Sequence, residues 1–155
     1  MLHGQVVAVV VPAFQEENNI EATLTAMPVL VDHIIVVDDA STDATSSRAE
    51  EVDDPRITVI VREHNGGVGA AIITGHKRAL ELGADVSVVM AGDAQMNPDY
   101  LPDLLEPVAM GGYGFAKANR FFSATSYQGM PVWRVIGSIV LTFLNKASSG
   151  YWNLV

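Results

Sequence analysis

Four short runs of apolar, mostly β-branched residues recur along the chain, and each is followed by a segment with helical features. The apolar runs lie at residues 5–11, 33–37, 57–61 and 86–90. The helical segments lie at residues 18–27, 43–52, 69–82 and 98–108. Strands that are apolar at successive positions are typical of a parallel sheet buried on both faces. The alternation therefore predicts an α/β fold with a mostly parallel sheet flanked by helices.

The remainder of the chain adds two expected elements, a fifth strand at 114–120 and a helix at 130–147. With 155 residues, of which 49% are hydrophobic, we expect one domain with a sizeable core. The chain has no cysteine, which excludes disulfides and thiolate metal sites. It also contains no run of about 18 apolar residues, so no membrane-spanning helix is predicted within this stretch.

Charge is distributed unevenly along the sequence. The net charge is −9, and all 18 acidic residues lie between Glu16 and Glu106. The acidic total argues against nucleic acid as a partner. Residues 107–155 contain no acid but four basic residues, which predicts a second binding environment at this end of the chain, with chance clustering as the alternative.

Polar and glycine residues gather directly after each of the four apolar runs. The segments that follow them read "PAFQEEN", "DDASTD", "REHNGG" and "AGDAQ". In open parallel sheets, ligands bind outside the carboxyl ends of the strands. We therefore expect the active site at this edge of the sheet. Individually the motifs have simpler explanations: Ser41 or Asp43 is suited to capping a helix, and the glycines to a tight turn.

Taken together, five motifs resemble those of the inverting GT-A glycosyltransferases of family 2. They read "VVVPAFQEENNI", "VVDDASTDAT", "REHNGGVGAA", "MAGDAQMNPDYLPDLL" and "KANRF". The resemblance covers about residues 5–153 and is closest to the dolichyl-phosphate mannose synthase and polyprenyl-phosphate glucosyltransferase branch, to which "KANRF" and "GMPVWRVIGS" point. It implies a Rossmann-like GT-A domain over residues 1–155 that lacks its C-terminal portion.

The resemblance assigns a nucleotide pocket to the first two motifs. Pro12, Phe14 and Glu16 match a Pro-x-Tyr-Asn-Glu motif that lines this pocket, with Phe and Gln in place of Tyr and Asn. Asp39 matches the acid that accepts a hydrogen bond from the base. These residues are thus expected to bind the donor, a nucleotide diphosphate sugar of the GDP-mannose or UDP-glucose type.

The resemblance also implies a metal site. Asp93 and Gln95 match the end of an Asp-x-Asp-x-Gln motif that holds Mg²⁺ or Mn²⁺ against the diphosphate, where the cation neutralises the leaving group. Ala91 stands where the motif begins with Asp, so this chain has one carboxylate fewer. Asp93 is accordingly expected to serve donor binding, metal binding and catalysis.

For the acceptor, Arg120 and Arg134 match the phosphate-binding arginines of the same branch, and we expect both to act in catalysis. A phosphate monoester is already an anion near neutral pH, so it needs cations rather than a general base. The implied reaction is sugar transfer to a polyprenyl or dolichyl phosphate. Alternatives are a family 2 transferase acting on a saccharide hydroxyl, a nucleotide-sugar-binding module without turnover, and arginines that only contact the surface or lipid headgroups.

The apolar segment 130–147 fits two environments. It suits a core helix, or a helix resting on a lipid surface with Arg134 and Lys146 near its ends. The acid-free charge pattern around it favours lipid. We therefore expect the protein at the cytoplasmic face of a membrane.

Overall fold

A computed structural model describes residues 1–118 and 131–150 of the chain. The chain divides into two compact units, Met1–Ala116 and Lys117–Val155, and each is described by itself.

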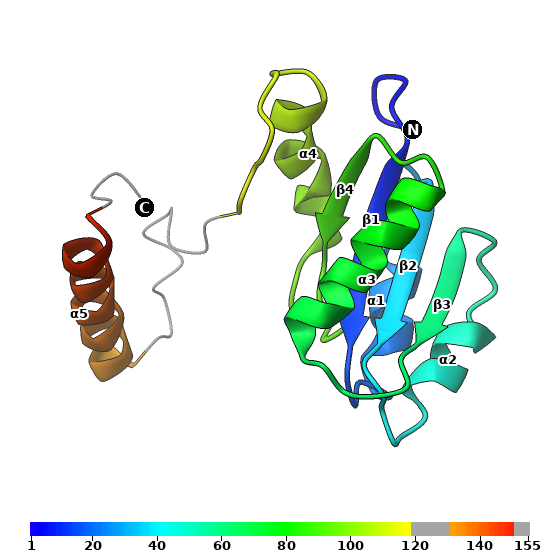
Figure 1. The fold of residues 1–155 in the computed structure, drawn as a ribbon, viewed down its shortest axis with the longest axis horizontal. Helices are drawn as coiled ribbons and strands as arrows, with labels where there is room; N and C mark the ends of the chain where they lie inside the picture. Colours follow the sequence, from blue (N-terminus) through cyan, green and yellow to red (C-terminus); the bar gives the residue numbers. More distant parts are fainter. Residues whose placement is uncertain (119–130, 151–155) are drawn as a thin grey trace. The chain divides into compact units, whose positions relative to one another are not determined.

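The first unit is built on a four-stranded sheet with the order β3-β2-β1-β4, in which all neighbouring strands are parallel (Figure 1). The strands are β1 (Val7–Ala13), β2 (His33–Asp38), β3 (Ile57–Val61) and β4 (Val86–Val89). All seven residues of β1 are buried, as continuous apolar runs predict for a central parallel strand. The predicted α/β class and parallel sheet are confirmed.

Helices cover both faces of this sheet. Three of them, α1 (Ile20–Thr25), α2 (Thr45–Glu51) and α4 (Leu101–Ala109), contribute to one apolar core, and α4 follows the short 3-10 helix η1 (Pro98–Tyr100). The opposite core is formed by α3 (Val68–Glu81), which lies across the sheet in Figure 1. The sheet is thus sandwiched between helices.

Close packing of α3 on β1 depends on a glycine in the middle of the helix. A Cβ atom at Gly75 would clash with Cγ1 of Val10. Glycine inside a helix costs about 0.5–1 kcal/mol relative to alanine. Glycine at position 75 therefore serves the close approach of α3 to β1 and not helix propensity. The contact fixes α3 against the central strand.

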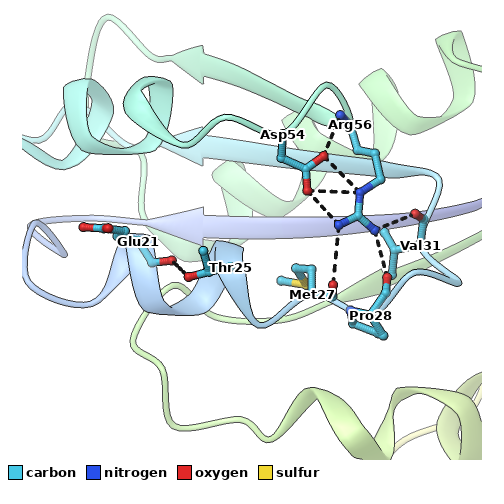
Figure 2. Close-up of polar contacts among 7 residues, drawn as sticks. All are labelled: Glu21, Thr25, Met27, Pro28, Val31, Asp54 and Arg56. Carbon is cyan, nitrogen blue, oxygen red and sulfur yellow. Dashed lines mark hydrogen bonds and ion pairs between the residues drawn. The ribbon is translucent and has the colours of Figure 1, made fainter.

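An arginine at the amino edge of the sheet joins the loop before β2 to the start of β3 (Figure 2). The Arg56 guanidinium binds both carboxylate oxygens of Asp54, and its Nη atoms donate to the carbonyl oxygens of Pro28 at 2.8 Å, Val31 at 3.1 Å and Met27 at 3.4 Å. The hydrogen bonds from Arg56 hold the pKa of Asp54 below its usual value. The Arg56 side chain thus links the loop before β2 to the start of β3 by hydrogen bonds and an ion pair.

Two expectations from the sequence need correction. The first helix is Ile20–Thr25 instead of 18–27, because Asn19 takes the N-cap position, with its side chain bonded to Glu16, and Ala26 takes the C-cap position. Residues 114–118 of the expected fifth strand form no strand, since no described strand pairs with them; residues 119 and 120 lie outside the described part.

The second unit contains α5 (Val132–Ser149), which agrees with the helix expected at 130–147. Its large apolar side chains are exposed in the structure, including Trp133, Ile136, Ile139 and Leu144. Within residues 1–118 and 131–150, no helix combines the length and apolar character needed to cross a membrane.

Candidate functional site

The loops after β1, β2 and β4 meet at the carboxyl edge of the sheet. The Gly92 N–H donates to the Pro12 carbonyl at 3.2 Å, and the Asp39 N–H donates to the Ala13 carbonyl at 2.9 Å. The main chain next to Asp93 and at Asp39 is therefore anchored on either side of β1. This arrangement confirms that the polar segments predicted after the strands share one edge.

Hydroxyl and carboxylate groups bind the first two of these loops to each other. The Gln15 N–H donates to Ser41 Oγ at 2.9 Å, and the Glu16 N–H donates to Thr45 Oγ1 at 2.8 Å. In return, the Ala44 N–H donates to a carboxylate oxygen of Glu17 at 3.1 Å. The two loops consequently behave as one hydrogen-bonded piece.

Three of the four non-glycine residues with a left-handed φ in the described part of the chain lie at this edge, and the fourth, His3, precedes β1. Gln15, Ala40 and Ala94 have φ values of 57°, 62° and 55°, and they follow β1, β2 and β4 respectively. A non-glycine residue in this region costs about 1–3 kcal/mol and persists where its surroundings enforce it. Such residues cluster at functional sites, so the strain supports a functional role for this edge.

Asp39 is buried, with 3% of its surface exposed, and its carboxylate is already engaged. Its Oδ1 accepts hydrogen bonds from the Arg62 guanidinium and from the Gly66 N–H at 3.1 Å. Burial by itself raises the pKa of the Asp39 carboxyl, but the bonds from Gly66, Arg62 and Gly67 outweigh it and hold the pKa below its usual value. Asp39 is thus an ionised acceptor with a fixed position.

Arg62 opens the motif "REHNGGVGAA", but the sequence analysis gives it no role in the site. A Cβ atom at Gly66 would lie 2.7 Å from both terminal nitrogens of Arg62, so the guanidinium packs directly against Gly66 and would have to shift for a larger residue. One sequence signal could have pointed to Arg62: it is a basic residue directly after the third apolar run. Because β3 pairs with β2, a residue at this position lies near the end of β2.

The remaining donor-binding candidates from β1 differ in exposure. Pro12 is buried at the end of the strand, Phe14 is 45% exposed, and Glu16 is half-buried with its Oε2 bonded to the Asn19 amide at 2.9 Å. Phe14 and Glu16 therefore leave surface for a ligand, whereas Pro12 shapes the backbone.

The loop after β4 presents the candidate metal ligands. Asp93 is half-buried and its Oδ1 accepts the Gln95 N–H at 3.1 Å, while Gln95 itself is exposed. Gly92 is buried, and a Cβ atom there would lie 3.3 Å from side-chain carbons of Ala13 and Ile20. The residue before Asp93 is thereby held against β1 and α1.

These side chains fit a hard divalent cation that is shared with phosphate. In the part of the chain that the structure describes, no three His, Cys, Asp or Glu side chains could hold a metal ion by themselves. Mg²⁺ is commonly bound through one or two carboxylates together with substrate phosphates and water. The Asp93 carboxylate and the Gln95 amide oxygen match this oxygen-only donor set, and Ala91 adds no ligand.

The described part of the structure does not place either of the two arginines expected at the acceptor phosphate in this site. Arg120 lies outside them, and Arg134 lies in α5 with its side chain outside them.

Comparison with known proteins places the chain in a family. The model of the family described as "Glycosyl transferase family 2" matches residues 8–150. The chain is 28% identical over 163 residues to a UDP-N-acetylglucosamine–dolichyl-phosphate N-acetylglucosaminyltransferase of Methanococcus voltae, covering 96% of this chain and 65% of the relative. It is 32% identical over 133 residues to a dolichol-phosphate mannosyltransferase of Pyrococcus furiosus, covering 83% of this chain and 37% of the relative.

A solved structure shares both fold and sequence with this chain. It is the glucosyl-3-phosphoglycerate synthase of Mycobacterium tuberculosis in complex with Mn²⁺, UDP-glucose and phosphoglyceric acid. The TM-score is 0.57 at 29% identity, and the match covers 70% of this chain and 41% of that protein. The likeness confirms the predicted GT-A fold. This chain spans less than two thirds of the length of each of these relatives.

Removal of Arg62 should destabilise the fold through Asp39. We expect Arg62→Met to lower the free energy of unfolding by about 2–4 kcal/mol near neutral pH, because it leaves a buried carboxylate without its cation. Since the pKa of Asp39 is lowered in the folded protein, the ionised carboxylate stabilises the fold above about pH 4, and that contribution is lost as the pH falls through the folded value. The deficit of the variant should therefore shrink on acidification.

Urea unfolding near neutral pH and near pH 3 measures this difference. Arg48→Met is the matched control. Arg48 is exposed on α2, and its replacement removes the same charge without leaving a buried carboxylate unpaired. Equal losses of stability in the two variants near neutral pH would contradict the structural role of the pair.

Proposed function

The chain belongs to glycosyl transferase family 2, and we propose that it transfers a sugar from a nucleotide diphosphate sugar to a polyprenyl phosphate. The observation that carries this proposal is the placement of Glu16, Asp39 and Asp93 around the carboxyl end of β1. The names of the relatives, which include a dolichyl-phosphate N-acetylglucosaminyltransferase and a dolichol-phosphate mannosyltransferase, support the acceptor class.

In this proposal the nucleotide lies over the ends of β1 and β2. Phe14 lines the pocket, the buried Pro12 shapes the backbone beside it, and Asp39 accepts a hydrogen bond from the base. An ionised carboxylate can only accept, so it suits bases that offer a ring N–H, as uracil and guanine do. The lowered pKa of Asp39 supports this role, because the carboxylate stays ionised across the physiological range.

The diphosphate lies beside the loop after β4. Asp93 and Gln95 would hold Mg²⁺ or Mn²⁺ there, and the cation would neutralise charge on the departing diphosphate. The structure of the M. tuberculosis synthase with Mn²⁺ and UDP-glucose supports the use of a divalent ion with the donor. Because Ala91 provides no carboxylate, Asp93 is the one carboxylate that residues 91–95 would offer the cation.

The acceptor phosphate would be bound by Arg120 and Arg134. Arginine presents a planar pair of donors that matches phosphate oxygens, which lysine does not. The exposed apolar side chains of α5 suit contact with lipid at the cytoplasmic face of a membrane, where a polyprenyl phosphate presents its headgroup.

A second candidate function is transfer to a hydroxyl group. It is favoured by the likeness to the glucosyl-3-phosphoglycerate synthase, whose structure contains phosphoglyceric acid. A third is nucleotide-sugar binding without turnover, which Ala91 favours. Release of nucleoside diphosphate, measured with a polyprenyl phosphate, with saccharide acceptors and with neither, separates the three: only the proposed transferase requires the lipid phosphate.

Replacement of Asp93 should abolish transfer. We expect Asp93→Asn to lower kcat/KM by about 100-fold or more, because the cation loses its carboxylate ligand. Calorimetric binding of the nucleoside diphosphate should weaken in the presence of Mg²⁺ or Mn²⁺. Asp99→Asn, an exposed change in η1, serves as the control, and Ala91→Asp should be tolerated and tighten metal binding. Near wild-type turnover of Asp93→Asn with either metal would remove Asp93 from the site.

The acceptor arginines should act on the lipid phosphate alone. We expect Arg120→Lys and Arg134→Lys each to lower turnover with polyprenyl phosphate while donor affinity stays near wild type; Lys146→Arg is the charge-conserving control. The rate should fall below about pH 6, where the acceptor phosphate becomes protonated. Steady-state rates with polyprenyl phosphate and with the corresponding alcohol test this assignment, and equal rates for the two acceptors would refute it.

A further inference from the structure

A buried threonine in α1 connects that helix to the loop that carries Asp93. Thr23 is 2% exposed, and its Oγ1 accepts the Ala94 N–H at 3.1 Å across 71 positions of sequence. The same hydroxyl donates to the Asn19 carbonyl at 3.1 Å. Its donor and one acceptor site are thus both used, which fixes the direction of the hydroxyl.

The other buried polar side chains among the described residues already have a part in the site. They are Asp38, Asp39 and Thr45. Asp38 accepts the Ser41 N–H at 2.9 Å, and Thr45 accepts the Glu16 N–H, so both support the loops after β1 and β2. Thr23 is the buried polar group of the described residues that supports the loop after β4.

The loop after β4 needs this support because Ala94 has an unfavourable backbone conformation. This residue has φ of 55°, a conformation that a non-glycine residue adopts at a cost. It lies between Asp93 and Gln95, whose N–H binds the Asp93 carboxylate. A shift of the Ala94 N–H would therefore turn the peptide that determines where the Asp93 carboxylate points.

We propose that Thr23 is a positioning residue that directs the Asp93 carboxylate toward the metal-bound diphosphate of the donor. The inference rests on the function proposed above and adds a residue that has no place in its motifs. Ile20, one turn earlier on α1, packs beside Gly92, so the helix holds the loop by a side-chain contact before Asp93 and a hydrogen bond after it.

The alternative is that Thr23 only stabilises α1 through its bond to Asn19. Thr25 in the same helix provides the matched control. It is exposed, and its hydroxyl donates to the Glu21 carbonyl four residues earlier, as Figure 2 shows. Thr25→Val therefore removes the same kind of helix bond without touching the Asp93 loop.

The test compares binding of UDP and of GDP to the full chain by calorimetry, in excess Mn²⁺ and in metal-free buffer. Thr23→Val preserves the shape of the side chain and removes the hydroxyl. We expect it to weaken Mn²⁺-dependent nucleotide binding by about 3- to 10-fold, the effect of one neutral hydrogen bond, while metal-free binding stays at the wild-type level. Thr23→Ser should restore the metal-dependent gain, and Thr25→Val should match the wild type.

Equal Mn²⁺-dependent binding by Thr23→Val and the wild type would overturn the positioning role and leave the proposed function intact. A wild-type chain without any Mn²⁺-dependent gain would overturn both. Amide hydrogen exchange on the unmodified chain provides a measurement that does not depend on a folded variant: the Ala94 amide should be protected, and exchange at the rate of a free amide would refute the contact.

Discussion

The position of the whole candidate site depends on the burial of β1 between β2 and β4. Because both neighbours are parallel to β1 and in register with it, their carboxyl ends arrive at the same edge. Backbone bonds from Asp39 to Ala13 and from Gly92 to Pro12 extend this alignment past the strands. Asp39, the proposed acceptor for the base, and Asp93, the proposed metal ligand, thereby come to lie on opposite sides of one strand, although 54 positions separate them in the sequence.

The loops at this edge hold costly backbone conformations because hydroxyl groups fix them. Gln15 donates to Ser41, and Ala94 donates to Thr23, so two of the three left-handed non-glycine residues at this edge are anchored through their own N–H groups. At the opposite edge, the Arg56 guanidinium binds Asp54 and carbonyl groups of the loop before β2, and His3, which precedes β1, is the non-glycine residue with a left-handed φ there among the described residues. Three such residues at the carboxyl edge, each following a different strand, fit a sheet that presents a ligand at its carboxyl end.

The sequence predicts the sheet, its helices and the edge that carries the site, because continuous apolar runs and the polar segments after them are local patterns. Contacts that depend on strand order are beyond such patterns. Arg62 meets Asp39 only because β3 lies next to β2, and Thr23 meets Ala94 only because α1 packs beside the loop after β4. The expected strand at 114–120 was wrong over residues 114–118, since an apolar segment becomes a strand only where a partner strand is present.

The central claim is that a nucleotide diphosphate with its divalent cation binds at the carboxyl edge around β1. Amide chemical shifts recorded while the chain is titrated with UDP or GDP and Mg²⁺ test it most directly. The account predicts that the largest changes fall in the four loops at residues 14–16, 39–41, 62–67 and 92–95, with the amides near Arg56 unchanged. Changes concentrated around Arg56, or the absence of any change in these four loops at saturating nucleotide, would contradict it.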